Sequence, residues 1–326
     1  MNITQLLGLT VRLLVPTLLV ALGGIFSFRI KVFPLGLEGY MLAGCFLAVT
    51  GTYLFGSPYL GMAFAAILVM LLALIFAFFV IELSVNPVIC AFAINTIVAG
   101  MTRFLMIPVF GSSGRIYLDS ALALPRFQVP IIKSIPIVAD IFNNHSALVY
   151  VALLLPFVIQ FVYYKTNYGL SLRATGAYEE AAVAVGISTR KVRYIALMTT
   201  GCLAGLGGAQ LSLTANLFNV GMTDGRGFTA LAAIVLSAGE PIRAFLGCIL
   251  FGLCDALVLN LSSEGIPIQF LSMLPYILAI LFAVMPPVIR KLSERTAFSK
   301  LQLRIRQNDP EILASRAFHH SVNSEE

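Results

Sequence analysis

The chain has 326 residues, of which 59% are hydrophobic and only 11% are charged, a balance far outside that of soluble domains. This length leaves room for about 8–10 membrane-spanning helices, because each needs ~20 residues to cross the hydrocarbon layer. We therefore predict an all-α polytopic membrane protein, with no room left for a soluble enzyme domain. The formal net charge of +6 comes from basic residues at the ends of apolar runs, a pattern that sets topology and does not indicate nucleic acid binding.

Nine apolar runs follow one another along the chain and give nine predicted crossings. They cover 11–28, 39–55, 59–81, 87–107, 146–164, 192–214, 227–238, 242–261 and 269–287. The run 227–238 is too short for a straight crossing, which predicts a half helix continued by irregular backbone inside the protein. The proline-containing segment 108–145 is expected to form a long external loop.

An internal repeat relates residues 36–107 to residues 225–287. The segment LEGYMLAG at 37–44 matches GRGFTALAA at 225–233, Gly56-Ser-Pro58 matches Gly239-Glu-Pro241, and Val85-Asn-Pro87 matches Gly265-Ile-Pro267. Five crossings separate the two copies, so they are expected to enter the membrane from opposite sides. Transporters with such inverted repeats place the substrate path at the repeat interface, beside broken helices.

The segment 165–193 is a polar interruption between two apolar runs. Its strong helix formers Glu179, Glu180, Ala181 and Ala182 precede Gly186, which predicts a short helix with a sharp end. Lysines and arginines concentrate on the side of this loop and of the C-terminal tail, 292–326, so we expect both to be cytoplasmic. The loop is predicted to be a docking surface, with the alternative that its basic residues only fix the topology.

The residues Glu180, Ala181, Ala182 and Gly186 resemble the cytoplasmic coupling loop of ABC importer permeases, and we therefore name the segment 165–193 the coupling loop. Further matching segments are LEGYMLAG, VNPVICAFAINTIVAG, DGRGFTALAAIVLSAGEP and GIPIQFLSMLPYILAIL. From about 11 to 290, the chain is similar to the permease family of ribose, branched-chain amino acid and nucleoside importers, and most similar to its simple sugar and nucleoside branch. It departs from that branch at FPLGLEG, 33–39, which leaves the substrate class open.

This resemblance implies a bacterial inner-membrane transport subunit that is not itself an enzyme. Its expected partners are a second permease, either a copy or a paralogue, an ATP-binding-cassette subunit, and an extracytoplasmic solute-binding protein. The sequence contains no GxxxxGK[ST] motif, so ATP and Mg²⁺ are expected on the partner subunit and no cofactor on this chain. The five cysteines lie in apolar runs without metal-ligand spacing, which indicates no metal site.

Polar side chains inside apolar runs are the candidates for the substrate path, because they are costly at membrane depth. Glu38 lies between two glycines at the start of the first repeat, where the alternative is an interfacial carboxylate neutralised by Arg29 or Lys31. Asn95 and Thr96 offer hydrogen-bonding groups to a polyhydroxylated solute, such as a sugar or nucleoside. The alternative for Asn95 is an interhelical hydrogen bond.

Two aromatic residues and one acidic residue complete the candidates. Phe104 and Phe228 are possible stacking surfaces for a ring, although most of the 24 phenylalanines are expected to pack or to face lipid. Asp255 lies deep in a predicted span, where it could carry a proton, pair with Arg243 or bond a neighbouring helix. A proton-coupled secondary transporter that uses Asp255 or Glu38 is therefore the alternative function, and a channel is a weaker one because no continuous polar stripe is evident.

Overall fold

The computed structural model describes residues 3–112, 114–119, 122–127, 145–262, 273 and 277. All of these except Ile277 belong to one compact unit, Met1–Tyr276. Several sequence predictions lie outside the described residues. They are the repeat match at 265–267, nearly all of the ninth apolar run at 269–287, the middle of the external loop and the tail at 292–326.

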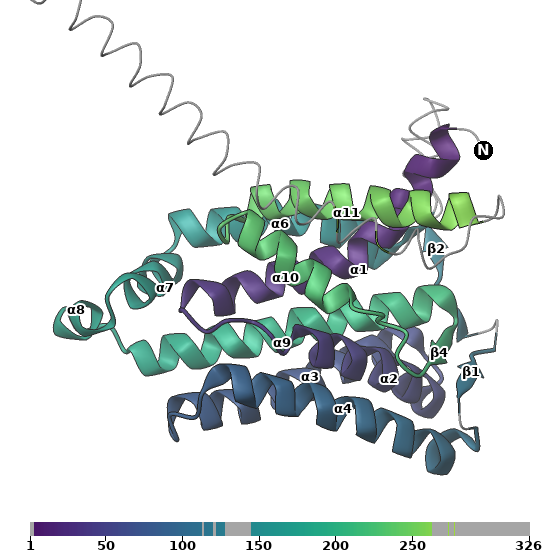
Figure 1. The fold of residues 1–326 in the computed structure, drawn as a ribbon, viewed down its shortest axis with the longest axis horizontal. Coiled ribbons are helices and arrows are strands. Elements are labelled where there is room, and N and C mark those ends of the chain that lie inside the picture. The colour runs from purple at the N-terminus through teal and green to yellow at the C-terminus, as the bar shows by residue number, and fades with distance from the viewer. Residues whose placement is uncertain are drawn as a thin grey trace, which may run out of the picture. The chain divides into compact units, whose positions relative to one another are not determined.

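The described residues are almost entirely helical (Figure 1). The helices are α1 (Ile3–Arg29), α2 (Leu37–Phe55), α3 (Pro58–Ile81), α4 (Pro87–Phe110), α6 (Ala147–Lys165), α7 (Asn167–Ala177), α8 (Glu179–Ala184), α9 (Thr189–Ala215), α10 (Arg226–Leu236) and α11 (Pro241–Ser262). Two short antiparallel pairs join β1 (Arg115–Tyr117) to β4 (Leu217–Asn219) and β2 (Arg126–Phe127) to β3 (His145–Ser146).

Six of the described helices are long and apolar enough to cross a membrane: α1, α3, α4, α6, α9 and α11. The predicted class, an all-α polytopic membrane protein, is confirmed. Helix α2 is not among the six, and 14 of its 19 residues are buried. It packs against α3, α4, α9 and α10. Because protein surrounds it, α2 does not need a lipid-facing surface of its own.

The eleven-residue helix α10 corresponds to the short apolar run at 227–238. Its length of ~16 Å is about half of the hydrocarbon thickness. The chain reaches α10 from β4 through residues 220–225, which form turns rather than regular structure. A short helix preceded by non-helical backbone is the arrangement that the length of this run predicts.

The two matched segments share their local backbone structure. Gly56 after α2 and Gly239 after α10 both have left-handed backbone conformations, with φ of 65° and 72°. In each case the next helix begins at a proline two residues later, Pro58 or Pro241. This order of helix, left-handed glycine and helix-starting proline corresponds to the matching Gly-X-Pro segments of the sequence repeat.

The two matched helices run away from a common point in opposite directions. The start of α2 contacts the start of α10, since Glu38 accepts hydrogen bonds from Gly225 and Gly227. The middle of α2 lies beside β4, where the rings of Phe46 and Phe218 are 5.4 Å apart. By contrast, the turn after α10 lies at the other end of the unit, beside the end of α1. Opposite directions are what an inverted repeat requires.

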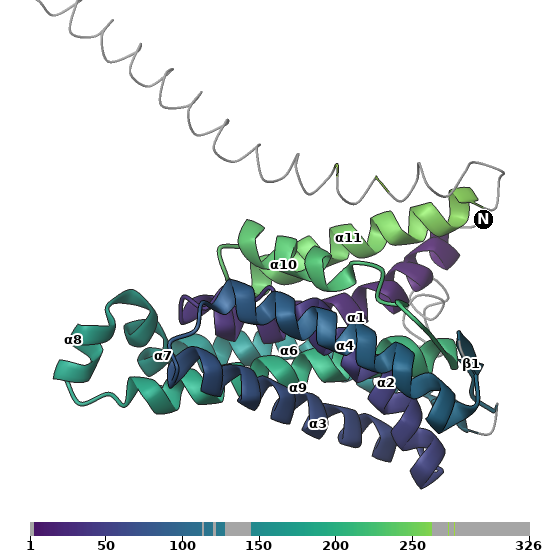
Figure 2. The same ribbon diagram turned by 60° about the horizontal axis from the view of Figure 1, so that its bottom comes forward.

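Helix α9 forms the centre of the unit and runs between α1 and α3 (Figures 1 and 2). Its small residues allow close backbone contacts, as is usual for membrane helices. A Cβ atom at Gly208 would collide with the backbone carbonyl of Met41 on α2, and one at Gly205 would be 2.9 Å from the Cβ of Val69 on α3. The close packing of α2 and α3 on α9 therefore depends on glycine at positions 205 and 208.

We predict that Gly208→Ala destabilises the protein by about 1–3 kcal/mol, because the added methyl group meets backbone atoms that cannot move independently. Gly100→Ala on α4 is the matched control, since a Cβ there would have no heavy atom within 4 Å. Thermal unfolding of the detergent-purified variants measures the difference. Equal stability of the two variants would show that α2 and α9 are not in close contact.

Candidate functional site

The carboxylate of Glu38 holds the start of α10. Its Oε1 accepts hydrogen bonds from the Thr223 hydroxyl at 2.6 Å and the Gly225 N–H at 3.1 Å, and its Oε2 accepts one from the Gly227 N–H at 2.8 Å. The first N–H groups of a helix have no partner within the helix, and a negative charge is favourable there. We name these four residues the Glu38 joint.

Gly227 is required for this contact because of its small size. A Cβ at Gly227 would lie 2.5 Å from the Cα and 2.6 Å from the N of Glu38. Gly225 has a φ of 78° and provides the left-handed turn before α10. The two glycines in the DGRG sequence therefore have distinct roles, one in close approach and one in backbone conformation.

Asn95 holds the start of α2 against α4. Its Oδ1 accepts a hydrogen bond from the Gly39 N–H at 2.9 Å, and its Nδ2 donates one to the Leu35 carbonyl at 3.0 Å. The structure thus shows the interhelical bonding that was the alternative for this residue. Asn95 on α4 therefore fixes the start of α2, and Glu38 on α2 in turn fixes the start of α10.

The ion pairs considered for the acidic candidates are different in the structure. Arg29 pairs with Glu240 at 2.6 Å and Lys31 donates to the Ala177 carbonyl at 3.0 Å, so neither residue is the partner of Glu38 that the alternative reading assumed. Asp255 on α11 forms an ion pair with Arg226, the first residue of α10, at 3.8 Å, and not with Arg243. Asp255 therefore also faces the start of α10.

The outward face of α4 carries polar and aromatic side chains. Thr96 and Arg103 are exposed, and 70% of Phe104 is accessible. The exposed face also includes Ile89, Phe92, Gly100 and Ile107. Helix α4 comes to the front of the unit in Figure 2. Phe228, the other aromatic candidate, is 38% exposed on α10 and so belongs to a different element.

The coupling loop folds into the helices α7 and α8 at one end of the unit, at the left of Figure 1. Helix α8 begins at Glu179 and ends at Ala184, and Gly186 follows with a φ of 84°, as the sequence pattern predicts for a helix with a sharp end. Ala182 is buried and anchors the helix, whereas Glu179, Glu180 and Ala181 are exposed.

An open depression lies beside α8. It is lined by Lys31, Ala177, Tyr178, Glu179, Glu180 and Val183. Tyr178 is 78% exposed and Val183 56% exposed, and Val185 nearby is 76% exposed. Large exposed apolar side chains on a polar loop indicate an interaction surface.

Two features of the site were missed by sequence reasoning. Arg103 was not among the candidate residues, although its spacing of seven residues from Thr96 places both on one helix face. The pairing of Arg29 with Glu240 joins residues 211 positions apart, and no local pattern indicates it.

The comparisons with known proteins agree with this architecture. The family described as branched-chain amino acid transport system / permease component matches residues 6–285. The chain is 33% identical over 299 residues to a guanosine ABC transporter permease protein of Bacillus subtilis. This alignment covers 86% of this chain and 92% of that protein. It is 31% identical over 279 residues to a nucleoside ABC transporter permease protein of Lactococcus lactis subsp. cremoris, with 82% and 87% covered.

A more distant relative is a glucose ABC transporter permease protein of Haloferax volcanii, 26% identical over 288 residues, with 82% and 72% covered. No solved structure matches the chain. The family match extends across the described helices from α1 to α11, and the resemblance inferred from the sequence motifs is confirmed. The chain belongs to the family of branched-chain amino acid transport system permease components and is a multi-pass permease subunit of an ABC transporter.

Proposed function

We propose that this subunit forms one wall of an import path for a simple sugar or nucleoside, and that the outward face of α4 lines this path. The relatives named for guanosine, nucleosides and glucose support this solute class. The observation that carries the proposal is the exposed guanidinium of Arg103 on a membrane-spanning helix.

The position of Arg103 is difficult to reconcile with a lipid-facing helix. It lies seven residues before the end of α4, which corresponds to ~10 Å along the axis. An arginine within a span costs up to about 2.5–3.5 kcal/mol, the value for the centre on insertion scales, and such residues usually face a water-filled cavity or another protein segment. A solvated path along this face of α4 removes that cost.

The residues around Arg103 suit a polar solute with a ring. Phe104 offers an exposed ring for stacking, and Arg103 offers donors for hydroxyl or carbonyl oxygens. At Gly100 the backbone is open, because a Cβ would meet nothing within 4 Å. Thr96 bonds the Phe92 carbonyl at 2.9 Å and can still accept a hydrogen bond from a solute.

The path requires a second wall, which a second permease subunit, as a copy or a paralogue, would supply opposite α4. We place the solute-binding protein on the extracytoplasmic side and the C-terminal tail in the cytoplasm of a bacterial cell. In this arrangement the depression beside α8 receives the ATP-binding-cassette subunit, which binds ATP and Mg²⁺, and this chain binds no cofactor.

A proton-coupled transporter that uses Glu38 or Asp255 is less well supported. Glu38 accepts three hydrogen bonds that fix α10, so its charge has a structural role without proton transfer. Asp255 faces Arg226. Membership of an ABC permease family agrees with ATP as the energy source.

We predict that Arg103→Gln raises the KM for uptake about tenfold, because a hydrogen bond from a charged donor to the solute contributes about 1.5–3 kcal/mol. The assay is uptake of labelled guanosine and of labelled glucose by cells that carry the complete transporter. Arg115→Gln, which removes an exposed arginine from β1, is the control and is expected to leave KM unchanged. An unchanged KM in Arg103→Gln for a transported solute would remove α4 from the path.

We predict that Glu180→Lys and Gly186→Asp uncouple transport without blocking membrane insertion. The first reverses a charge beside the depression, and the second forces a non-glycine residue into a left-handed conformation. Mass spectrometry of proteins that co-purify from native membranes measures the loss of the ATP-binding-cassette subunit.

Gly111→Asp is the control for backbone strain. Gly111 also has a left-handed conformation, with a φ of 68°, but it follows the last residue of α4 and does not belong to the coupling loop. This variant is expected to retain the ATP-binding subunit. Normal uptake in both Glu180→Lys and Gly186→Asp would be incompatible with docking at α8.

A further inference from the structure

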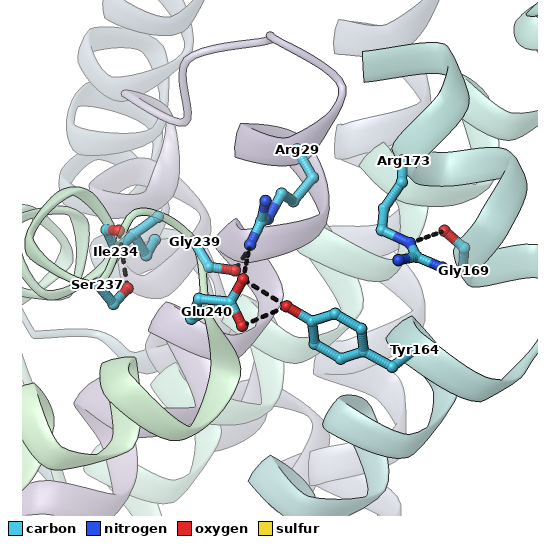
Figure 3. Close-up of polar contacts among 8 residues, drawn as sticks. All are labelled: Arg29, Tyr164, Gly169, Arg173, Ile234, Ser237, Gly239 and Glu240. Carbon is cyan, nitrogen blue, oxygen red and sulfur yellow. Dashed lines mark hydrogen bonds and ion pairs between the residues drawn. The ribbon is translucent and has the colours of Figure 1, made fainter. Parts of the chain in front are cut away.

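A cluster of polar and aromatic side chains joins the start of the coupling loop to the turn between α10 and α11 (Figure 3). The Tyr164 hydroxyl donates to the Glu240 carboxylate, with oxygen distances of 2.6 and 2.7 Å. Arg29 at the end of α1 donates from Nη2 to Glu240 at 2.6 Å and from Nε to the Gly239 carbonyl at 3.0 Å. We name Arg29, Tyr164 and Glu240 the Glu240 cluster.

Helix α7 is attached to this cluster. The Arg173 guanidinium lies over the rings of Tyr163 and Tyr164, 5.5 and 5.2 Å from their centres. Lys31, just after α1, donates to the carbonyl of Ala177 at the end of α7. Glycine is required at position 176, where a Cβ would collide with the Arg29 carbonyl. The first half of the coupling loop is therefore packed directly on the end of α1.

A second cluster of the same composition lies at the other end of the coupling loop. Tyr194 on α9 donates from its hydroxyl to Glu82 at 2.9 Å, and Arg190 donates to the same carboxylate at 2.7 Å. Glu82 caps the end of α3, and the turn after it leads to Pro87 at the start of α4. We name Glu82, Arg190 and Tyr194 the Glu82 cluster.

One cluster lies at the end of α10, and the other lies before α4, the helix that lines the candidate path. The turn at Glu240 follows the last residue of α10, and Glu38 holds the first turn of the same helix. The turn at Glu82 precedes α4, whose outward face carries Arg103. Because α10 is a single helix of 11 residues, a displacement of its final turn also moves its first turn.

We infer that the Glu240 and Glu82 clusters are the two links by which movement of the coupling loop reaches α10 and α4. Tyr164, Tyr194, Glu240 and Glu82 act as positioning residues and do not contact the solute. This inference rests on the proposed function, since it assumes that the loop moves when the ATP-binding subunit works.

The charge on Glu240 suits such a link. Burial acts to raise the pKa of Glu240, but hydrogen bonds from Tyr164 and Arg29 outweigh it, so the pKa is lowered from its ordinary value. The carboxylate is thus ionised at neutral pH. Partly exposed ion pairs add little stability, yet three donors, the Tyr164 hydroxyl and the Nε and Nη2 groups of Arg29, fix the orientation of the turn at Gly239 and Glu240, and the link depends on this orientation.

The test is the double variant Tyr164→Phe with Tyr194→Phe, which removes two hydroxyl groups and keeps both rings. Purified transporter in vesicles is assayed for ATP hydrolysis and for solute uptake, and the uptake per ATP hydrolysed is compared. We expect this ratio to fall at least fivefold, in the range of coupling between sites, while the ATP-binding subunit stays bound. Glu240→Gln with Glu82→Gln gives a second pair with the same expected result.

Tyr168→Phe is the matched control. Its hydroxyl is buried on α7 and has no hydrogen-bond partner among the described residues, so its removal is expected to leave the ratio unchanged. A purely structural role of the clusters would lower the amount of folded protein and leave the ratio intact.

The outcomes separate the two proposals. Wild-type uptake that needs no ATP would refute the proposed function, whatever the variants do. ATP-driven wild-type uptake, with an unchanged ratio in both double variants, would refute the links and leave the proposed function standing.

Discussion

The architecture depends on the need to satisfy backbone polar groups inside a membrane protein, where no bulk water can do so. A broken helix creates unpaired N–H groups at membrane depth, and each would cost several kcal/mol if left alone. In this chain a single carboxylate, Glu38, accepts hydrogen bonds from two N–H groups at the start of α10. Asn95 satisfies the N–H of Gly39 in the first turn of α2.

Glu38 and Asn95 bring the starts of the two repeat copies together and hold them there. The starts of α2 and α10 meet, and each helix then runs toward a different end of the unit. One end carries β4, and the other carries Arg29 and the coupling loop. The contact between the repeats is therefore connected both to the candidate path along α4 and to the surface at α8. The proposed function needs both connections, because it places the solute along α4 and the ATP-binding subunit at α8.

Much of the fold could be predicted from the sequence. The runs 59–81 and 242–261 differ by one residue at a boundary or less from α3 and α11 as observed, and Gly186 has the left-handed conformation expected of a helix breaker. These features are local, since apolar length and glycine placement determine them. All of the proposed site roles remain predictions: the substrate-path roles of Glu38, Asn95, Thr96, Phe104, Phe228 and Asp255, and the docking roles of Glu179, Glu180, Ala181, Ala182 and Gly186.

The contacts that assemble the site could not be predicted in the same way. Glu38 and Gly227 are 189 residues apart, and Tyr164 and Glu240 are 76 apart. Composition and periodicity do not specify which charged residue meets which, so the sequence offered Arg29 and Lys31 as alternative partners of Glu38 and did not indicate the start of helix α10. The residue class at these positions was informative, because a polar group at membrane depth needs a partner. The identity of the partner required the structure.

Hydrogen–deuterium exchange of α10 in the Glu38→Gln variant tests the central role of the Glu38 joint most directly. The amide side chain can accept with one oxygen only, and its NH₂ group would face the N–H of Gly227 or of Gly225. We predict that the first turn of α10 exchanges about tenfold faster or more than in the wild type, in line with the loss of a hydrogen bond to a charged group. Peptides from α3 should be unchanged. Equal exchange in the first turn of α10 would contradict the account, because Glu38 would then not hold the second repeat.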